Sequence, residues 1–272
     1  MDSQQKKPTF PTSGFLVLGI FLFIFTVGGC FHTPSQPDGP PHYNVDMRKI
    51  HDPVPHYLPK SKYGNPTYYY VKGRRYHVLT TARGYDKRGI ASWYGTKFNG
   101  RLTSTREPYN LLGMTAASPE LPIPCFVRVT NLENGRQVIV KVNDRGPFAA
   151  NRVMDLSYVA ARKLGYAGRG TALVQVSSID EPNPLQHTRP YFAHHHPKLY
   201  LQVGAFSEMH NAAHLERELR RFTHRRIYIA HEAHGRRLYR VQIGPLQTVD
   251  ESDALQERIA RSGLGHAITV IG

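Results

Sequence analysis

Two proline-rich segments divide the 272-residue chain and constrain its fold more than any other feature. Residues 31–60 contain seven prolines and no apolar periodicity, and residues 181–197 contain four prolines and four histidines. Such composition is typical of extended linkers rather than packed elements. The sequence therefore predicts a tether over 30–75, a linker over 181–197, and two folded domains over 76–180 and 198–272.

The first 29 residues indicate an export signal. Two lysines precede an uncharged run over 15–27, which is too short to cross a bilayer as a helix, since that takes about 20 residues. Gly28-Gly29-Cys30 follows, and small residues before a cysteine resemble a bacterial lipoprotein cleavage site. We expect 1–29 to be a signal peptide and Cys30 to carry a lipid anchor. Phe31 favours the outer membrane; a soluble secretory signal and an uncleaved anchor are the alternatives.

The net charge and the cysteine content limit the classes of ligand that the chain is expected to bind. The net charge is +15, which in an exported protein favours anionic polymers of the cell envelope over nucleic acid. Two cysteines exclude a disulfide scaffold and a four-cysteine zinc site. With Cys30 lipidated, Cys125 is expected to be buried and unreactive. Three consecutive histidines (194–196) cannot all face one ion, so no metal or other cofactor is expected.

An internal repeat at an offset of 40 residues defines the second domain. Residues 201–206 (LQVGAF) match 241–246 (VQIGPL), and apolar or small residues at helical spacing follow each copy. Thr248 and Glu251 form a capping-box pattern for the second helix. With short strands near 227–230 and 267–271, the order β-α-β occurs twice. This predicts a ferredoxin-like βαββαβ sheet with helices on one face.

Alternation along the repeated strands predicts which side chains face the helices. Val203 and Ala205 should point toward the helices. The open face should carry Gln202, Gly204, Arg240 and Gln242. A polar face with a glycine suits a polar ligand, whereas an RNA-binding sheet of this topology would carry aromatic residues there.

The first domain is predicted to be mostly β, a compact barrel with a helix over 157–164. Asp144 follows an apolar strand, and Glu107 lies in a polar loop. Two carboxylates on different segments can serve acid–base chemistry on a glycosidic bond. Alternatively, Asp144 caps its Gly-Pro turn and Glu107 is a solvated charge.

Several motifs resemble one family. GIASWYG (89–95), TAA (115–117), VKVNDRGPF (140–148) and DLSYVAARKLG (155–165) resemble the rare lipoprotein A (RlpA) family, and QVGAF followed by YRVQIGP resembles a SPOR domain. The family joins a lipoprotein signal, a double-psi β-barrel and a SPOR domain in this order. The resemblance implies a lytic transglycosylase that cleaves the MurNAc–GlcNAc bond and leaves a 1,6-anhydro end, without water or metal.

The resemblance also implies residue roles: Asp144 as general acid and Glu107 as an assisting carboxylate. The chain departs from the family motifs at four positions: Asn99, Arg106, Asn110 and Ser118. Ser118 replaces a histidine, and serine does not titrate near pH 7. A catalytically silent glycan-binding protein is therefore the alternative function.

Further substrate contacts are expected from both domains. Trp93 and Tyr94 could stack on sugar rings or pack inside the barrel. Arg145 could hold a muramoyl carboxylate or pair within the fold. The remaining candidates are Ser118, Gln202, Arg240 and Gln242. SPOR domains bind septal glycan strands stripped of stem peptides, so the expected partners are such strands, the outer membrane through Cys30, and division-site proteins.

Overall fold

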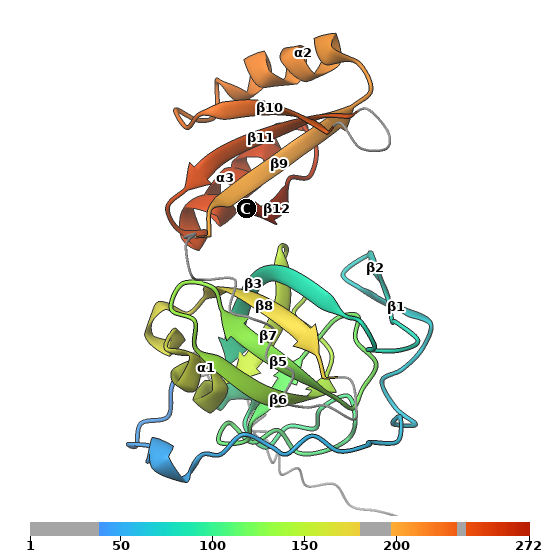
Figure 1. The fold of residues 1–272 in the computed structure, drawn as a ribbon, viewed down its shortest axis with the longest axis vertical. Coiled ribbons are helices and arrows are strands. Elements are labelled where there is room, and N and C mark those ends of the chain that lie inside the picture. The colour runs from blue at the N-terminus through green and yellow to red at the C-terminus, as the bar shows by residue number, and fades with distance from the viewer. Residues whose placement is uncertain (1–37, 180–196, 233–237) are drawn as a thin grey trace, which may run out of the picture. The chain divides into compact units, whose positions relative to one another are not determined.

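The computed structural model describes residues 38–179, 197–232 and 238–272 (Figure 1). The predicted signal peptide, the predicted lipidation site Cys30 and the three linker histidines lie outside these residues. Within the described ranges, no helix combines the length and apolar character needed to cross a bilayer.

Six strands of the first domain close into a barrel in the order β3-β7-β4-β6-β5-β8. Their bounds are β3 (Asp86–Tyr94), β4 (Thr115–Ala117), β5 (Cys125–Asn131), β6 (Gln137–Asp144), β7 (Arg152–Ser157) and β8 (Ala172–Ser178). Two pairs, β3 with β7 and β4 with β6, are parallel, and the other pairs are antiparallel. The predicted double-psi barrel is confirmed.

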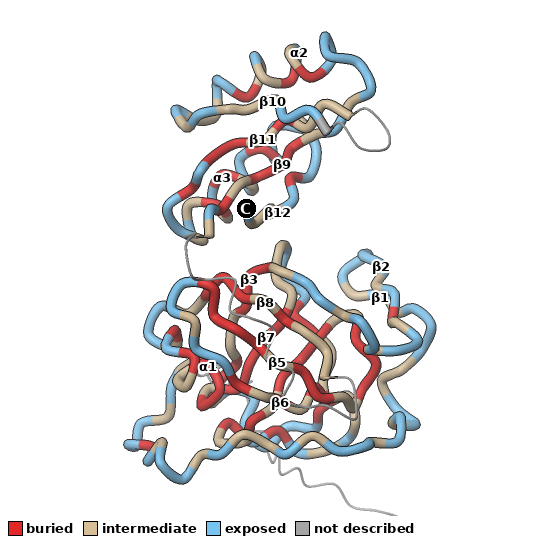
Figure 2. The backbone as a smooth tube through the Cα atoms, viewed as in Figure 1, coloured by how far each residue is buried: buried red, intermediate tan, exposed pale blue. Residues whose placement is uncertain are grey.

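The barrel strands consist largely of buried residues (Figure 2), and most of these are apolar. The β-branched residues of β5, β6 and β8 suit a pleated, buried surface. Fully or almost fully buried members are Val127, Val129, Val138, Val140, Val142, Met154, Leu156, Val174 and Val176. The helix α1 (Tyr158–Leu164) closes one side: the Ser157 hydroxyl accepts from the Ala160 N–H at 3.3 Å, and Gly165 ends the helix with a φ of 81°.

The part of the expected tether that is described packs along the barrel. We call residues 38–66 the strap; it forms no regular element except the short 3-10 helix η1 (Met47–Lys49). Val45 is buried in the barrel's hydrophobic cluster. The Asp52 carboxylate accepts from Lys163 Nζ at 2.6 Å and from the Ile139 N–H at 2.8 Å. Figure 1 shows the strap in blue, passing α1 and β6.

A two-stranded hairpin follows the strap and belongs to neither sheet of the two domains. It consists of β1 (Tyr68–Val71) and β2 (Arg74–His77), paired antiparallel. Short 3-10 turns η2 (Thr96–Phe98) and η3 (Ala167–Arg169) complete this half of the chain.

The second domain has the predicted βαββαβ order. Its elements are β9 (Leu199–Phe206), α2 (Met209–Leu219), β10 (Ile227–Glu232), β11 (Leu238–Leu246), α3 (Val249–Arg261) and β12 (Ile268–Ile271). The antiparallel sheet has the order β10-β11-β9-β12. Both helices pack into one cluster with Leu201, Val241 and Ile243. The Thr248 hydroxyl accepts from the Glu251 N–H at 3.1 Å, which confirms the predicted cap.

The predicted facing of two β9 residues is wrong. Gln202 pairs with Gln242, but Gly204 pairs with Val241 and Ala205 with Arg240, so one extra residue is inserted at Val203. This bulge reverses the alternation. A side chain at Gly204 would meet Leu215 of α2 at 2.8 Å, and Ala205 is exposed. Gly204 therefore faces the helices, while Gln202, Arg240 and Gln242 share the open face as predicted.

The strap's attachment can be tested at Asp52. We expect Asp52→Ala to lower the free energy of unfolding by about 1–3 kcal/mol, because the Ile139 N–H and the Lys163 ammonium lose their acceptor. Urea denaturation followed by circular dichroism measures the change. Asp86→Ala is the control, since its exposed carboxylate bonds the Gln175 amide at the surface; a similar loss in both variants would contradict a structural role for the strap.

Candidate active site

Asp144 is the last residue of β6, and its carboxylate is held firmly on one side. Oδ1 accepts three hydrogen bonds: from the Ser104 N–H at 2.8 Å, the Ser104 hydroxyl at 2.7 Å and the Arg145 N–H at 2.7 Å. Within the described part of the chain, Oδ2 receives no hydrogen bond. The carboxylate thus has a fixed orientation with one oxygen available to a ligand, as a proton-transfer group requires.

Ser104 is a site residue that the sequence analysis missed. Besides holding Asp144, its hydroxyl accepts from the Arg145 N–H at 3.1 Å. The run Thr103-Ser104-Thr105 was the available signal, since hydroxyl side chains commonly bond nearby backbone in loops. Two residues later, Arg106 adopts a φ of 70°, a conformation that favours glycine. The glycine of the motif that this segment resembles would adopt the same conformation without strain.

Glu107 lies in the loop that contains Ser104, and both of its carboxylate oxygens accept hydrogen bonds from β6. Oε1 accepts from Lys141 Nζ at 2.7 Å and Oε2 from Asn143 Nδ2 at 2.9 Å, both on β6. Burial alone would raise the pKa of Glu107, but the hydrogen bonds and charge of Lys141, with the bond from Asn143, outweigh it and lower the pKa. Glu107 is an ionised side chain that docks the Ser104 loop onto β6.

The Arg145 guanidinium donates its hydrogen bonds to groups within the fold. Nε donates to Gly64 O at 2.7 Å, and Nη2 donates to Asn65 Oδ1 at 3.1 Å. Nη1 donates to Ser118 O at 3.0 Å and to Leu121 O at 2.6 Å. Burial lowers the pKa of Arg145, yet a guanidinium stays charged at neutral pH. The geometry favours pairing within the fold over capture of a muramoyl carboxylate.

Ser118 has an exposed fraction of 0%. Its hydroxyl accepts from the Leu121 N–H at 3.2 Å, while its own N–H donates to Asp144 O at 3.0 Å. The side chain closes the turn after β4 instead of reaching the surface. The position that the family fills with histidine is therefore occupied here by a buried turn residue, next to the backbone of the proposed acid.

Trp93 and Tyr94 lie at the end of β3, and both rings pack. Trp93 Nε1 donates to Ala167 O at 3.1 Å, and its ring lies 5.4 Å from that of Tyr158. Tyr94 is buried with its ring centroid 4.1 Å from that of Tyr109. These contacts favour the packing alternative over sugar stacking for both residues.

Asp155 on β7 is a second acidic residue that the sequence analysis did not single out. Ala117 of β4 pairs with Asp144 on one side and with Asp155 on the other. Burial raises the pKa of Asp155, the Ser92 hydroxyl bond opposes this, and the charge of Asp144 adds to the rise. The signal was its place in the DLSY segment, beside the strand that leads to Ser118.

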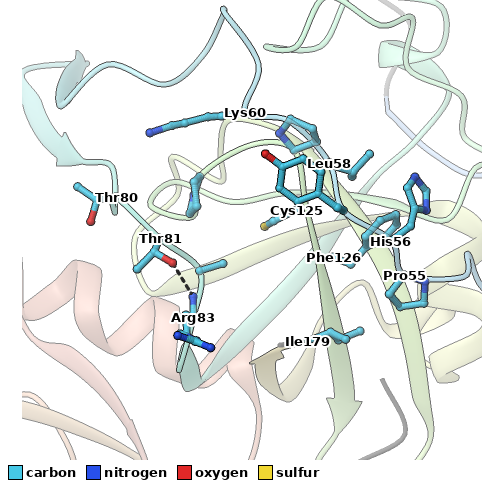
Figure 3. Close-up of a pocket in the computed structure, with 14 residues that line it drawn as sticks. Pro55, His56, Leu58, Lys60, Thr80, Thr81, Arg83, Cys125, Phe126 and Ile179 are labelled. Atoms are coloured by element: carbon cyan, nitrogen blue, oxygen red, sulfur yellow. Dashed lines mark hydrogen bonds between the residues drawn. The ribbon is translucent and has the colours of Figure 1, made fainter. Parts of the chain in front are cut away.

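Cys125 lies on the wall of a separate cavity of about 410 Å³ between the strap and β5 (Figure 3). Leu58 and Phe126 are among the other lining residues, whereas Asp144 and Glu107 are not. Burial raises the pKa of the Cys125 thiol to about 12. The thiol is therefore protonated at neutral pH and a poor nucleophile, as expected, but Cys125 is only partly buried, whereas burial was predicted.

The candidate ligand residues of the second domain lie close together. Gln202 Oε1 accepts from Arg240 Nη1 and from Gln242 Nε2, each at 3.4 Å. The three side chains come from the two central strands, β9 and β11. They form a connected polar group on the face of the sheet opposite the helices, as the strand pattern predicted; Gln202 is buried there, and Arg240 and Gln242 are partly exposed.

The lowered pKa of Glu107 predicts a pH effect on stability. Because the folded-state pKa lies below its ordinary 4.5, the stabilisation is present above that pH and is lost as pH falls through the folded pKa. We expect the stability advantage of the wild type over Glu107→Gln to shrink from about pH 7 to about pH 3, measured by urea denaturation. Glu208→Gln, at an exposed position, is the control; an advantage that does not change with pH would contradict the prediction.

Comparisons with known proteins agree with this architecture. A family model described as "Lytic transglycolase" matches residues 86–176, and the SPOR domain model matches 196–269. A Pseudomonas aeruginosa protein named endolytic peptidoglycan transglycosylase RlpA is 37% identical over 89% of this chain and 86% of its own length. The Vibrio cholerae protein of that name is 33% identical over 90% and 93%.

A solved structure is also similar to part of this chain. The SPOR domain of Pseudomonas aeruginosa RlpA is 34% identical and covers 26% of this chain and 96% of its own, with a TM-score of 0.26. The family assignment depends on the two full-length relatives and on the order of the two matched domains. The chain belongs to the RlpA family.

Proposed function

We propose that this chain is an endolytic peptidoglycan transglycosylase with Asp144 as its general acid. Asp144 donates a proton to the oxygen that leaves C1 of MurNAc, and the C6 hydroxyl of the same sugar forms the new bond to C1. The hydroxyl proton passes to the Asp144 carboxylate, which restores the acid. The products are a 1,6-anhydro end and a free 4-hydroxyl on GlcNAc. The observation that carries this proposal is the Asp144 carboxylate, held through Oδ1 alone.

Ser104 and Glu107 act as positioning residues in this proposal. Ser104 fixes the carboxylate directly. Glu107 assists indirectly, because its contacts with Lys141 and Asn143 hold the loop that contains Ser104 on β6. Preorganised hydrogen bonds of this kind avoid reorganisation during proton transfer.

The second domain would direct the enzyme to its substrate. We assign the barrel to 76–180 and the SPOR domain to 198–272, separated by the linker 181–197. The polar group of Gln202, Arg240 and Gln242 offers donors and acceptors suited to sugar hydroxyls and acetamido groups. We place the protein in the periplasm, anchored to the outer membrane through Cys30 and concentrated at the septum, where strands lacking stem peptides are its preferred substrate.

One observation favours a second function, a non-catalytic glycan-binding lipoprotein. Ser118 is buried and occupied by its own turn, so nothing at that position can supply the chemistry of a histidine. In that case the barrel would bind glycan without cutting it, and the SPOR domain would provide septal targeting.

Substitution of Asp144 distinguishes the two functions. With the full chain purified in detergent, we expect wild type to release 1,6-anhydro-muramoyl fragments from peptide-free glycan strands, detected by mass spectrometry. Asp144→Asn should reduce release by a factor of about 10²–10⁴, the usual contribution of a general acid, with unchanged thermal unfolding. Asp86→Asn is the exposed control. Full activity of Asp144→Asn refutes the acid assignment, and binding without fragments from wild type supports the second function.

The sheet of the SPOR domain can be tested at Arg240. We expect Arg240→Ala to weaken co-sedimentation with amidase-treated sacculi roughly tenfold, because a hydrogen bond from a charged donor contributes about 1.5–3 kcal/mol. Arg217→Ala, on helix α2, is the matched control for charge. Equal weakening in both variants would mean that net charge, rather than this face of the sheet, governs binding.

A further inference from the structure

The β1-β2 hairpin places aromatic rings beside the Asp144 motif. Tyr69 and Tyr76 are cross-strand partners, with ring centroids 5.3 Å apart and planes inclined by 16°. Phe148, four residues after Asp144, meets both rings nearly edge to face, at 6.2 Å and 5.5 Å. The hairpin lies outside residues 86–176, the range of the barrel's family model, so it adds a surface to the barrel.

This cluster is tied to the active-site backbone. The Tyr69 hydroxyl donates to Pro119 O at 2.8 Å, next to Ser118. The Arg145 guanidinium lies 6.0 Å from the Tyr69 ring centroid, and the Arg145 N–H bonds Asp144. Burial raises the pKa of Tyr69 to about 12, Arg145 opposes this, and Tyr76 and Asp144 add to it. The hydroxyl therefore remains a donor, and the charge of Asp144 is among the groups that affect it.

The exposed parts of the cluster have the chemistry of a carbohydrate surface. Phe148 is 39% exposed although it is a large apolar side chain. Arg74 is exposed, and its guanidinium carbon lies over the Tyr76 ring, 5.3 Å from the ring centroid. A rigid ring matches the apolar face of a sugar, and an exposed guanidinium matches a carboxylate. A glycan strand whose muramoyl residues carry lactyl carboxylates offers both features at regular spacing.

We propose that Phe148, supported by the Tyr69–Tyr76 pair, is a sugar-binding subsite next to Asp144, and that Arg74 meets a muramoyl carboxylate of the same strand. The proposal rests on the proposed function and deepens it. The subsite holds the strand beside the acid through a sugar other than those at the broken bond. It accounts for the exposure of Phe148 and for an aromatic and basic hairpin outside the barrel.

The test compares the two faces of the same hairpin. Tyr70 alternates with Tyr69 and is 62% exposed, so Tyr70→Ala removes an equal side chain from the opposite face. We expect Phe148→Ala and Tyr76→Ala to raise KM for peptide-free strands roughly three- to tenfold with kcat little changed, as for the loss of one aromatic contact. Tyr70→Ala should match wild type, and Phe148→Trp and Tyr76→Phe should retain a low KM.

The carboxylate contact is tested separately with Arg74→Gln. The KM of Arg74→Gln should rise for glycan strands and stay unchanged for uncharged chitin oligosaccharides of equal length. If the enzyme does not cut chitin oligosaccharides, their Kd is measured in the Asp144→Asn background, and Arg74→Gln should leave this Kd unchanged. A KM that rises equally for both substrates would overturn the carboxylate contact. Circular dichroism melts check the fold of every variant.

The outcomes separate this proposal from the proposed function. Suppose that wild type cuts strands, and that the KM values of Phe148→Ala and Tyr76→Ala equal that of Tyr70→Ala. This result refutes the subsite and leaves the proposed transglycosylase activity supported. A fall in kcat alone would also refute it, since it would assign the rings to positioning Asp144. If wild type does not cut, the same series is read as strand affinity: weaker binding of Phe148→Ala than of Tyr70→Ala supports the subsite, and equal binding overturns it.

Discussion

The partly buried guanidinium of Arg145 makes the interactions on which the site depends. One side chain bonds the strap through Gly64 and Asn65, and the turn after β4 through Ser118 and Leu121. Its backbone N–H meanwhile fixes Asp144. Segments far apart in the sequence therefore converge on the residue next to the proposed acid. Removing this side chain would take a hydrogen-bond donor from four acceptors, of which Asn65 Oδ1 keeps the bond from the Ile123 N–H, so this position tolerates little change.

The periodic parts of the fold were predictable because their signals are local. Apolar alternation over 126–129 indicated β5 and an apolar run over 138–142 indicated β6, and the 40-residue repeat with helical spacing predicted the βαββαβ order. Ser157 and Gly165 marked the ends of α1. The reversal at Val203 was not predictable, because a bulge depends on the partner strand and leaves no mark in a single strand's alternation.

The site was predictable in its proposed acid but not in the support around it. Asp144 stood out at a strand end in a distinctive motif. Ser104 bonds it from 40 residues away, a contact that no spacing rule reveals. Glu107 was singled out for chemistry, yet its bonds to Lys141 and Asn143 give it a docking role. Long-range pairing of this kind depends on the closed barrel, so it becomes visible only with the fold.

The strap changes the length scale on which an anchored enzyme would work. The composition predicted that the whole segment from Cys30 to about residue 75 is a tether that does not pack on the barrel. Such a tether spans roughly 150 Å when fully extended. Residues 38–66 bind along the barrel, so only seven residues, 31–37, lie between Cys30 and the folded surface. If Cys30 carries the proposed lipid, the two are at most roughly 30 Å apart. The barrel would then act only on glycan within a few nanometres of its membrane, while the linker 181–197 would set how much farther into the wall the SPOR domain can bind.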